Sequence, residues 1–205
     1  MRRKISALLA VLLCSLGAAL TAACNSAPIA GGQNPDEQPD NGMNAVCPDF
    51  EVEILGKYED DEEPEIYCPV NTRGKITVLN FWGVWIEDSL TELPAFYEVA
   101  QQNADTVALV AIHSAEYTVP SKDDEDELTV YESIVEKGWD KWNVTFAQDV
   151  EQKNGLSAYD LLGGLGTYPM TVILNEEGLI SYKRMGITSS EQLQAMMHPA
   201  VTNKF

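Results

Sequence analysis

The sequence contains no Cys-x-x-Cys pair, and its four cysteines are too few to form a disulfide scaffold in a chain of 205 residues. Basic residues are scarce too: 13 Lys and Arg stand against 32 Asp and Glu, a formal charge of −19. This charge would repel a phosphate backbone, so we expect no nucleic-acid partner, and charge alone would not hold the chain on an anionic membrane. The remaining composition, 45% hydrophobic and 22% charged, is that of one ordinary globular domain with extensions.

The first apolar run is too short for a membrane-spanning helix. It covers 16 residues, from Ile5 to Leu20, whereas a bilayer core requires about 20. Three basic residues precede it, and Leu-Thr-Ala-Ala-Cys24 follows it, which resembles the bacterial lipobox. The sequence therefore predicts a lipoprotein signal peptide in 1–23 and an extracytoplasmic chain held by lipid at Cys24 on the outer face of the cytoplasmic membrane. Ordinary secretion and a retained helix are the alternatives.

Removal of the signal peptide leaves 10 basic and 32 acidic residues, a formal charge of −22. Residues 24–44 are rich in Pro, Gly, Asn and acids, which predicts a flexible tether. Cys47 and Cys68 then remain as the two unmodified thiols, in a compartment that permits disulfides. They flank a predicted hairpin, so we expect a structural disulfide between them, and a redox-active pair is the alternative.

From Cys47 onward, short extended runs alternate with helical windows, which indicates an α/β domain over 45–205. The run at 76–82 is almost continuously apolar, as expected for a central strand buried on both faces. The expected strands are 50–54, 66–67, 76–82, 106–112, 144–146, 170–174 and 179–182, and the expected helices are 90–102, 128–137, 154–162 and 188–197. Thr188 to Glu191 has the spacing of a capping box for the last helix.

Three segments carry a resemblance to a known family. They are Cys47-Pro-Asp-Phe50; Gly74-Lys-Ile-Thr-Val-Leu-Asn-Phe-Trp-Gly-Val-Trp85 followed by Glu92-Leu-Pro94; and Gly166-Thr-Tyr-Pro169-Met-Thr-Val-Ile-Leu-Asn-Glu-Glu-Gly178. Together they resemble the membrane-tethered thiol-disulfide oxidoreductases of the TlpA/ResA type. The resemblance implies a thioredoxin-like fold, with a mixed central sheet flanked by helices and an N-terminal β-hairpin. It also implies a cis peptide bond before Pro169.

The sequence departs from that family at the reactive positions. Where the family has Cys-x-x-Cys after Trp85, this chain has Ile86, Glu87, Asp88 and Ser89. Thiol–disulfide exchange requires sulfur at both the attacking and the resolving position, so a hydroxyl does not replace it. Either Asp88 or Ser89 caps the following helix and the acids favour its dipole, or these side chains form a new ligand or acid–base site beside Pro169.

We therefore expect a protein without dithiol activity that binds a protein or peptide. Its groove would be formed by Trp85, Ile86, Ser89, Thr167, Tyr168 and Pro169, and we assign no catalytic residue, cofactor or metal. One alternative is a working oxidoreductase that uses Cys47 and Cys68, and another is a structural or adhesive surface lipoprotein. We expect His113, at the end of a buried strand, to make a local hydrogen bond rather than to bind metal.

Overall fold

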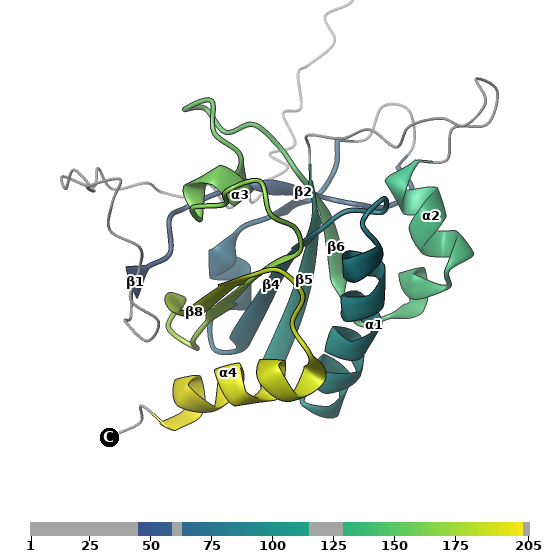
Figure 1. Ribbon diagram of the computed structural model, residues 1–205. Helices are drawn as coiled ribbons and strands as arrows, with labels where there is room; N and C mark the ends of the chain where they lie inside the picture. The colour runs from purple at the N-terminus through teal and green to yellow at the C-terminus, as the bar shows by residue number, and fades with distance from the viewer. Residues whose placement is uncertain (1–44, 59–62, 115–128, 203–205) are drawn as a thin grey trace, which may run out of the picture.

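The computed structural model describes residues 45–58, 63–114 and 129–202 (Figure 1). The predicted signal peptide, the tether and Cys24 lie outside these residues. The described chain forms one mixed eight-stranded sheet in the order β1-β8-β7-β4-β5-β6-β2-β3. The strands are β1 (Ala45–Val46), β2 (Val52–Ile54), β3 (Ile66–Tyr67), β4 (Ile76–Trp82), β5 (Val107–His113), β6 (Thr145–Asp149), β7 (Met170–Leu174) and β8 (Leu179–Met185).

Helices cover both faces of this sheet. They are α1 (Glu87–Gln102), α2 (Val130–Glu136), α3 (Ala158–Leu161) and α4 (Ser190–Thr202), with 3-10 turns η1 (Pro69–Thr72) and η2 (Trp139–Lys141). Buried residues of α1, α2 and α4 share one hydrophobic cluster, and those of α3 belong to a second cluster on the other face (Figure 1). No helix in the described part of the chain is long and apolar enough to cross a bilayer. The expected α/β class with a thioredoxin-like architecture is confirmed.

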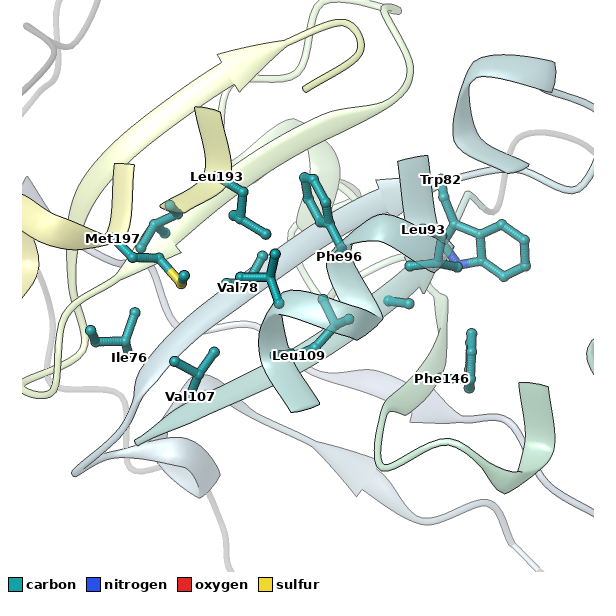
Figure 2. Close-up of a cluster of buried hydrophobic side chains, with 14 of the residues drawn as sticks. Ile76, Val78, Trp82, Leu93, Phe96, Val107, Leu109, Phe146, Leu193 and Met197 are labelled. Carbon is teal, nitrogen blue, oxygen red and sulfur yellow. The ribbon is translucent and has the colours of Figure 1, made fainter. Parts of the chain in front are cut away.

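All seven residues of the central strand β4 are buried. Its side chains alternate between the two faces: Val78 and Trp82 join the cluster under α1 and α4, whereas Leu79 and Phe81 join the cluster under α3. Figure 2 shows the first cluster, where Phe96 of α1 packs close to β4. A fully buried aliphatic or aromatic side chain of this kind contributes about 1.5–3 kcal/mol to stability.

The strand directions place several chain ends at one edge of the sheet. β4, β5 and β6 are parallel, so their carboxyl ends meet there. β7 is antiparallel to β4, with Met170 opposite Phe81, so the segment before β7 reaches the same edge. The segment that follows β4 and leads into α1 therefore starts beside Pro169.

The predicted hairpin is present as β2 and β3, with Val52 paired to Tyr67. Other elements differ from the sequence-based expectations. β1 was not predicted, because two residues carry no periodicity, and it pairs with β8 at the sheet edge. The predicted capping box of α4 is shifted: Ser189 Oγ accepts from the N–H of Gln192, and the Gln192 side chain accepts from the Ser189 N–H. Glu191 instead accepts from the Ser189 hydroxyl.

Candidate functional site

Helix α1 begins at the position where the resembled family has its first cysteine. Ile86 is the N-cap, in an extended conformation, and its side chain offers no capping oxygen. Glu87 and Asp88 follow as exposed acids in the first turn, where the helix dipole favours negative charge. The prediction that Asp88 or Ser89 caps this helix is wrong: Ser89 is fully buried, and its hydroxyl has no hydrogen-bond partner.

A buried histidine holds the segment that leads into α1. The N–H of Val84 donates to Nε2 of His113 at 3.4 Å, and Nδ1 of the same ring lies 3.2 Å from Oε1 of Gln148. Because Nε2 accepts, the ring proton sits on Nδ1 and is donated to Gln148. The ring also meets Trp82 and Trp85 edge-on, at centroid distances of 5.3 and 5.0 Å. The local hydrogen bonding expected for His113 is confirmed.

Burial lowers the pKa of His113 to about 4, against the hydrogen bond to Gln148, which raises it. The neutral ring is therefore the form present near neutral pH. In the part of the chain that the structure describes, no three His, Cys, Asp or Glu side chains are grouped so that they could hold a metal ion.

The loop before Pro169 is held by a tyrosine of α3. The Tyr159 hydroxyl donates to the carbonyl of Thr167 at 2.8 Å, and its ring stacks on Tyr168 at 4.4 Å. The hydroxyls of Tyr168 and Ser114 lie 2.8 Å apart, which ties the loop to the end of β5. The peptide bond between Tyr168 and Pro169 is cis, as the resemblance implied.

Two further residues fix Tyr159 itself. The buried carboxylate of Asp149 accepts from the N–H groups of Ala158 and Tyr159 at 2.8 and 3.1 Å, so it holds the start of α3. Burial raises the pKa of Asp149, and these two hydrogen bonds lower it. A Cβ on Gly164 would lie 2.1 Å from the Tyr159 ring, so only glycine allows the loop to approach this closely.

A buried carboxylic acid lies beneath the first half of α1. Oε1 of Glu92 accepts from the Asn80 amide at 2.7 Å, and Oε2 accepts from the N–H of Thr188. Burial raises the pKa of Glu92 to about 7, while these hydrogen bonds and nearby Arg184 lower it. Glu92 thus joins α1 to β4 and to the segment between β8 and α4.

Several polar atoms beside Glu92 lack partners. In the described structure, Asn80 Oδ1, Ser89 Oγ, Thr171 Oγ1 and Arg184 Nε are buried without a hydrogen bond. Asn80, Thr171 and Arg184 lie opposite one another across β4, β7 and β8. They form one polar row under α1, on the same side as Glu92.

Cys47 precedes β2 and Cys68 follows β3, so neither belongs to α1 or to the segment that leads into it. Both are buried thiols in the structure, and Cys47 belongs to the cluster on the α3 face. Burial, assisted by the charge of Asp49, raises the pKa of the Cys47 thiol to about 12. Cys68 is the N-cap of η1, a position not expected from the sequence. The charges of both thiols raise the pKa of the Tyr67 hydroxyl, so both cysteines lie near Tyr67. The disulfide between them stays a prediction.

The predicted groove residues differ in how far they are exposed to solvent. Trp85, Ile86 and Tyr168 are half-buried and Thr167 is exposed, whereas Ser89 and Pro169 are buried. The sequence reasoning missed Glu92, Tyr159 and Gln148. Glu92 stood inside a quoted motif, and an acid on the apolar side of a helix is the signal that could have marked it.

One cavity, of about 920 Å³, lies apart from these residues. It opens between α2 and the segment after β2, and it is lined by Leu55, Tyr58, Val130, Glu132 and Gln148 among others. It shares only Gln148 with the interactions described above. We centre the candidate site on α1 and the Pro169 loop, because the cavity brings together none of the residues discussed there except Gln148.

Comparison with known proteins supports a thioredoxin-like protein. No family model matches the chain. A curated relative, the thioredoxin-like protein YneN of Bacillus subtilis (strain 168), is 25% identical over 148 residues, which cover 72% of this chain and 74% of that protein. The similarity to this relative agrees with the thioredoxin-like fold of the chain.

Solved structures share the fold at lower identity. The exposed lipoprotein thioredoxin Etrx1 of Streptococcus pneumoniae strain TIGR4 has a TM-score of 0.52 and 21% identity, over 74% of this chain and 99% of that one. A putative thioredoxin of Neisseria meningitidis has a TM-score of 0.57 and 18% identity, over 79% and 93% of the two chains. A putative thiol:disulfide interchange protein DsbE of Chlorobium tepidum has a TM-score of 0.52 and 16% identity, over 79% and 98%.

Proposed function

We propose that this chain is a TlpA/ResA-type lipoprotein that has lost dithiol chemistry and binds protein or peptide segments without forming a covalent bond. The binding surface consists of Trp85, Ile86, Thr167 and Tyr168, backed by buried Pro169. The observation that carries the proposal is Ile86 at the N-cap of α1, beside a Pro169 loop that several contacts hold in place.

The chemistry of the site argues against exchange. Ile86 has no ionisable atom, and Ser89 is buried under the helix, so neither can attack or resolve a disulfide. A half-buried isoleucine instead offers apolar surface, and burying such surface is favourable by about 25 cal/mol per Å². We therefore leave Ser89 out of the contact surface and keep Ile86 at its centre.

The alternative, oxidoreduction through Cys47 and Cys68, has less support. The thiolate is the reactive form of cysteine, and a thiol with a pKa of about 12 is almost entirely protonated at neutral pH. Neither cysteine lies at the start of a long helix, where the dipole would stabilise a thiolate.

Placement outside the cytoplasm, with lipid at Cys24, belongs to the same proposal. It is supported by the lipobox-like sequence, and a structural neighbour is described as an exposed lipoprotein. Cell fractionation tests it: the wild type should be found with membranes and Cys24→Ala should not. A membrane-bound Cys24→Ala protein would contradict the lipid anchor.

The functional proposal is tested by two assays on one protein preparation. We expect no catalysis of insulin reduction, and saturable binding of an extended apolar peptide that lacks cysteine. Cys47→Ser is the control, because it removes one of the two thiols the alternative requires. Insulin reduction that disappears with Cys47→Ser would overturn the proposal.

A further inference from the structure

Ile187 is an exposed isoleucine between the Pro169 loop and helix α1. The N–H of Gly186, just before it, donates to the Pro169 carbonyl at 2.8 Å, and the N–H of Thr188, just after it, donates to the Glu92 carboxylate. Its backbone is thus fixed from both sides, and 44% of the residue is exposed. An apolar side chain held at the surface here extends the proposed binding surface beyond the predicted groove.

The loop that ends at Pro169 presents a second exposed aliphatic side chain. Leu165 is 82% exposed, the highest value for a large hydrophobic residue in the described chain. The contacts of Tyr159 to Thr167 and Tyr168 hold the loop just after it. Leu165 therefore belongs to the same loop as Thr167 and Tyr168 of the proposed binding surface.

The charge beside these apolar residues is negative. Glu87 and Asp88 are exposed, and neither has an ion-pair partner among the described residues. Asp88 precedes Glu92 by one helical turn, on the side of α1 that faces the segment carrying Ile187. The helix N-terminus contributes about half a positive charge, which two full carboxylates outweigh.

The two basic side chains of β8 nearest this segment are only partly exposed. Arg184 lies close enough to Glu92 to lower the pKa of that acid. The Lys183 ammonium donates to the carbonyls of Leu162 and Gly163 at 3.1 and 3.2 Å. This leaves an acidic and apolar surface on a chain whose formal charge is −19.

We propose that this surface, formed by Ile86, Glu87, Asp88 and Ile187, takes a partner segment in which a large apolar residue is flanked by Lys or Arg. The inference rests on the proposed function and names the class of its ligand. Apolar contact with Ile86 and Ile187 would favour any hydrophobic segment, whereas the two carboxylates select the basic one. The net charge of the whole chain would speed the approach of a basic partner and oppose an acidic one.

The test uses three fluorescent peptides that share one apolar centre and differ in their flanking residues, which are Lys, Ser or Glu. Anisotropy titration of the purified chain at physiological salt should give an affinity about 3- to 30-fold higher for the Lys peptide than for the Ser peptide, since two exposed ion pairs contribute modestly. Ile187→Ser should lower the affinity for both the Lys and the Ser peptide. The double variant Glu87→Gln, Asp88→Asn should reduce the Lys advantage to below about threefold.

The matched control is Glu98→Gln with Asp105→Asn, which changes the net charge equally. Both acids are exposed, and Glu98 lies about 16 Å along α1 from Glu87. This control should keep the Lys advantage.

Each outcome separates the two proposals. Equal affinity for the Lys and Ser peptides would overturn this inference and leave peptide binding intact, whereas absence of binding by all three would overturn the proposed function itself. Equal losses in the two double variants would show that only net charge matters, which also overturns the inference.

Discussion

Glu92 and His113 are both buried on the α1 face of the sheet, and burial favours the uncharged form of each. Glu92 is an acid whose pKa rises to about 7, and His113 is a base whose pKa falls to about 4. As pH rises, Glu92 therefore lowers the free energy of unfolding, whereas His113 raises it. Between about pH 4.5 and 6.5 their effects oppose each other in the wild type, so single variants are needed to reveal them.

The variant Glu92→Gln should remove a loss of stability that occurs as pH rises. Glu92 has a higher pKa in the folded than in the unfolded chain, so the unfolded chain ionises first as pH increases from about 4.5 to about 7. The wild type should lose up to about 3 kcal/mol of unfolding free energy from this group, and the variant none of it. Urea unfolding at several pH values measures this difference. The same slope in both proteins would show that Glu92 does not titrate as described.

The variant His113→Phe should remove a loss of stability that occurs as pH falls. The pKa of His113 is lower in the folded chain, so the unfolded chain takes up the proton first as pH drops from about 6.5 to about 4. Phenylalanine keeps an aromatic ring against Trp85 but leaves the Val84 N–H without an acceptor. At pH 7 we expect a loss of about 1–2 kcal/mol in unfolding free energy. An acid-side slope that persists in this variant would assign it to another group.

Two substitutions test whether the Tyr159 contacts position the binding loop. Tyr159→Phe removes the hydrogen bond to Thr167 and keeps the stack on Tyr168, so we expect a loss of about 1 kcal/mol in stability and weaker peptide binding. Gly164→Ala places a methyl group inside the van der Waals distance of the Tyr159 ring and should weaken binding more strongly. Anisotropy and thermal unfolding measure the two effects separately. Unchanged affinity in both variants would mean that the loop does not take part in binding.

Sulfur can be restored to the site as a test of its geometry. The quadruple variant Ile86→Cys, Glu87→Gly, Asp88→Pro, Ser89→Cys removes two acids that would raise the thiol pKa values and places two thiols three residues apart at the start of a 16-residue helix. We expect it to form an 86–89 disulfide and to reduce insulin measurably. A folded variant without that disulfide would show that the start of α1 is not arranged as in a thiol–disulfide oxidoreductase.

The sequence predicted the elements whose limits are marked locally. β7 was predicted with its observed bounds because Pro169 and Asn175 bracket a run that is apolar except for Thr171. β8 was predicted only to Tyr182 but continues to Met185, because Lys183 and Arg184 interrupt the apolar pattern while their backbones still pair with β7. A ladder between distant segments extends a strand beyond what its own side chains indicate.

The same distinction applies to the site. Ile86 to Ser89 and Pro169 were identified by resemblance to a family motif, which is a local feature. Ile187 was missed because its position depends on hydrogen bonds that link 186 to 169 and 188 to 92, across long stretches of chain. Ser89 was misjudged because burial depends on how α1 packs on the sheet, which spacing alone does not fix.

The central claim, non-covalent binding at Ile86, is tested most directly by the affinity of the chain for an extended apolar peptide that contains no cysteine. Ile86→Ser removes the apolar surface and supplies a favourable N-cap, so α1 should form normally. Ile66→Ser is the matched control, since it makes the same substitution at an exposed isoleucine on edge strand β3. We expect saturable binding by the wild type and by Ile66→Ser, and a loss of about tenfold or more in Ile86→Ser, since burying one such side chain is favourable by about 1.5–3 kcal/mol. Failure of the wild type to bind, or equal affinity in Ile86→Ser, would contradict the account.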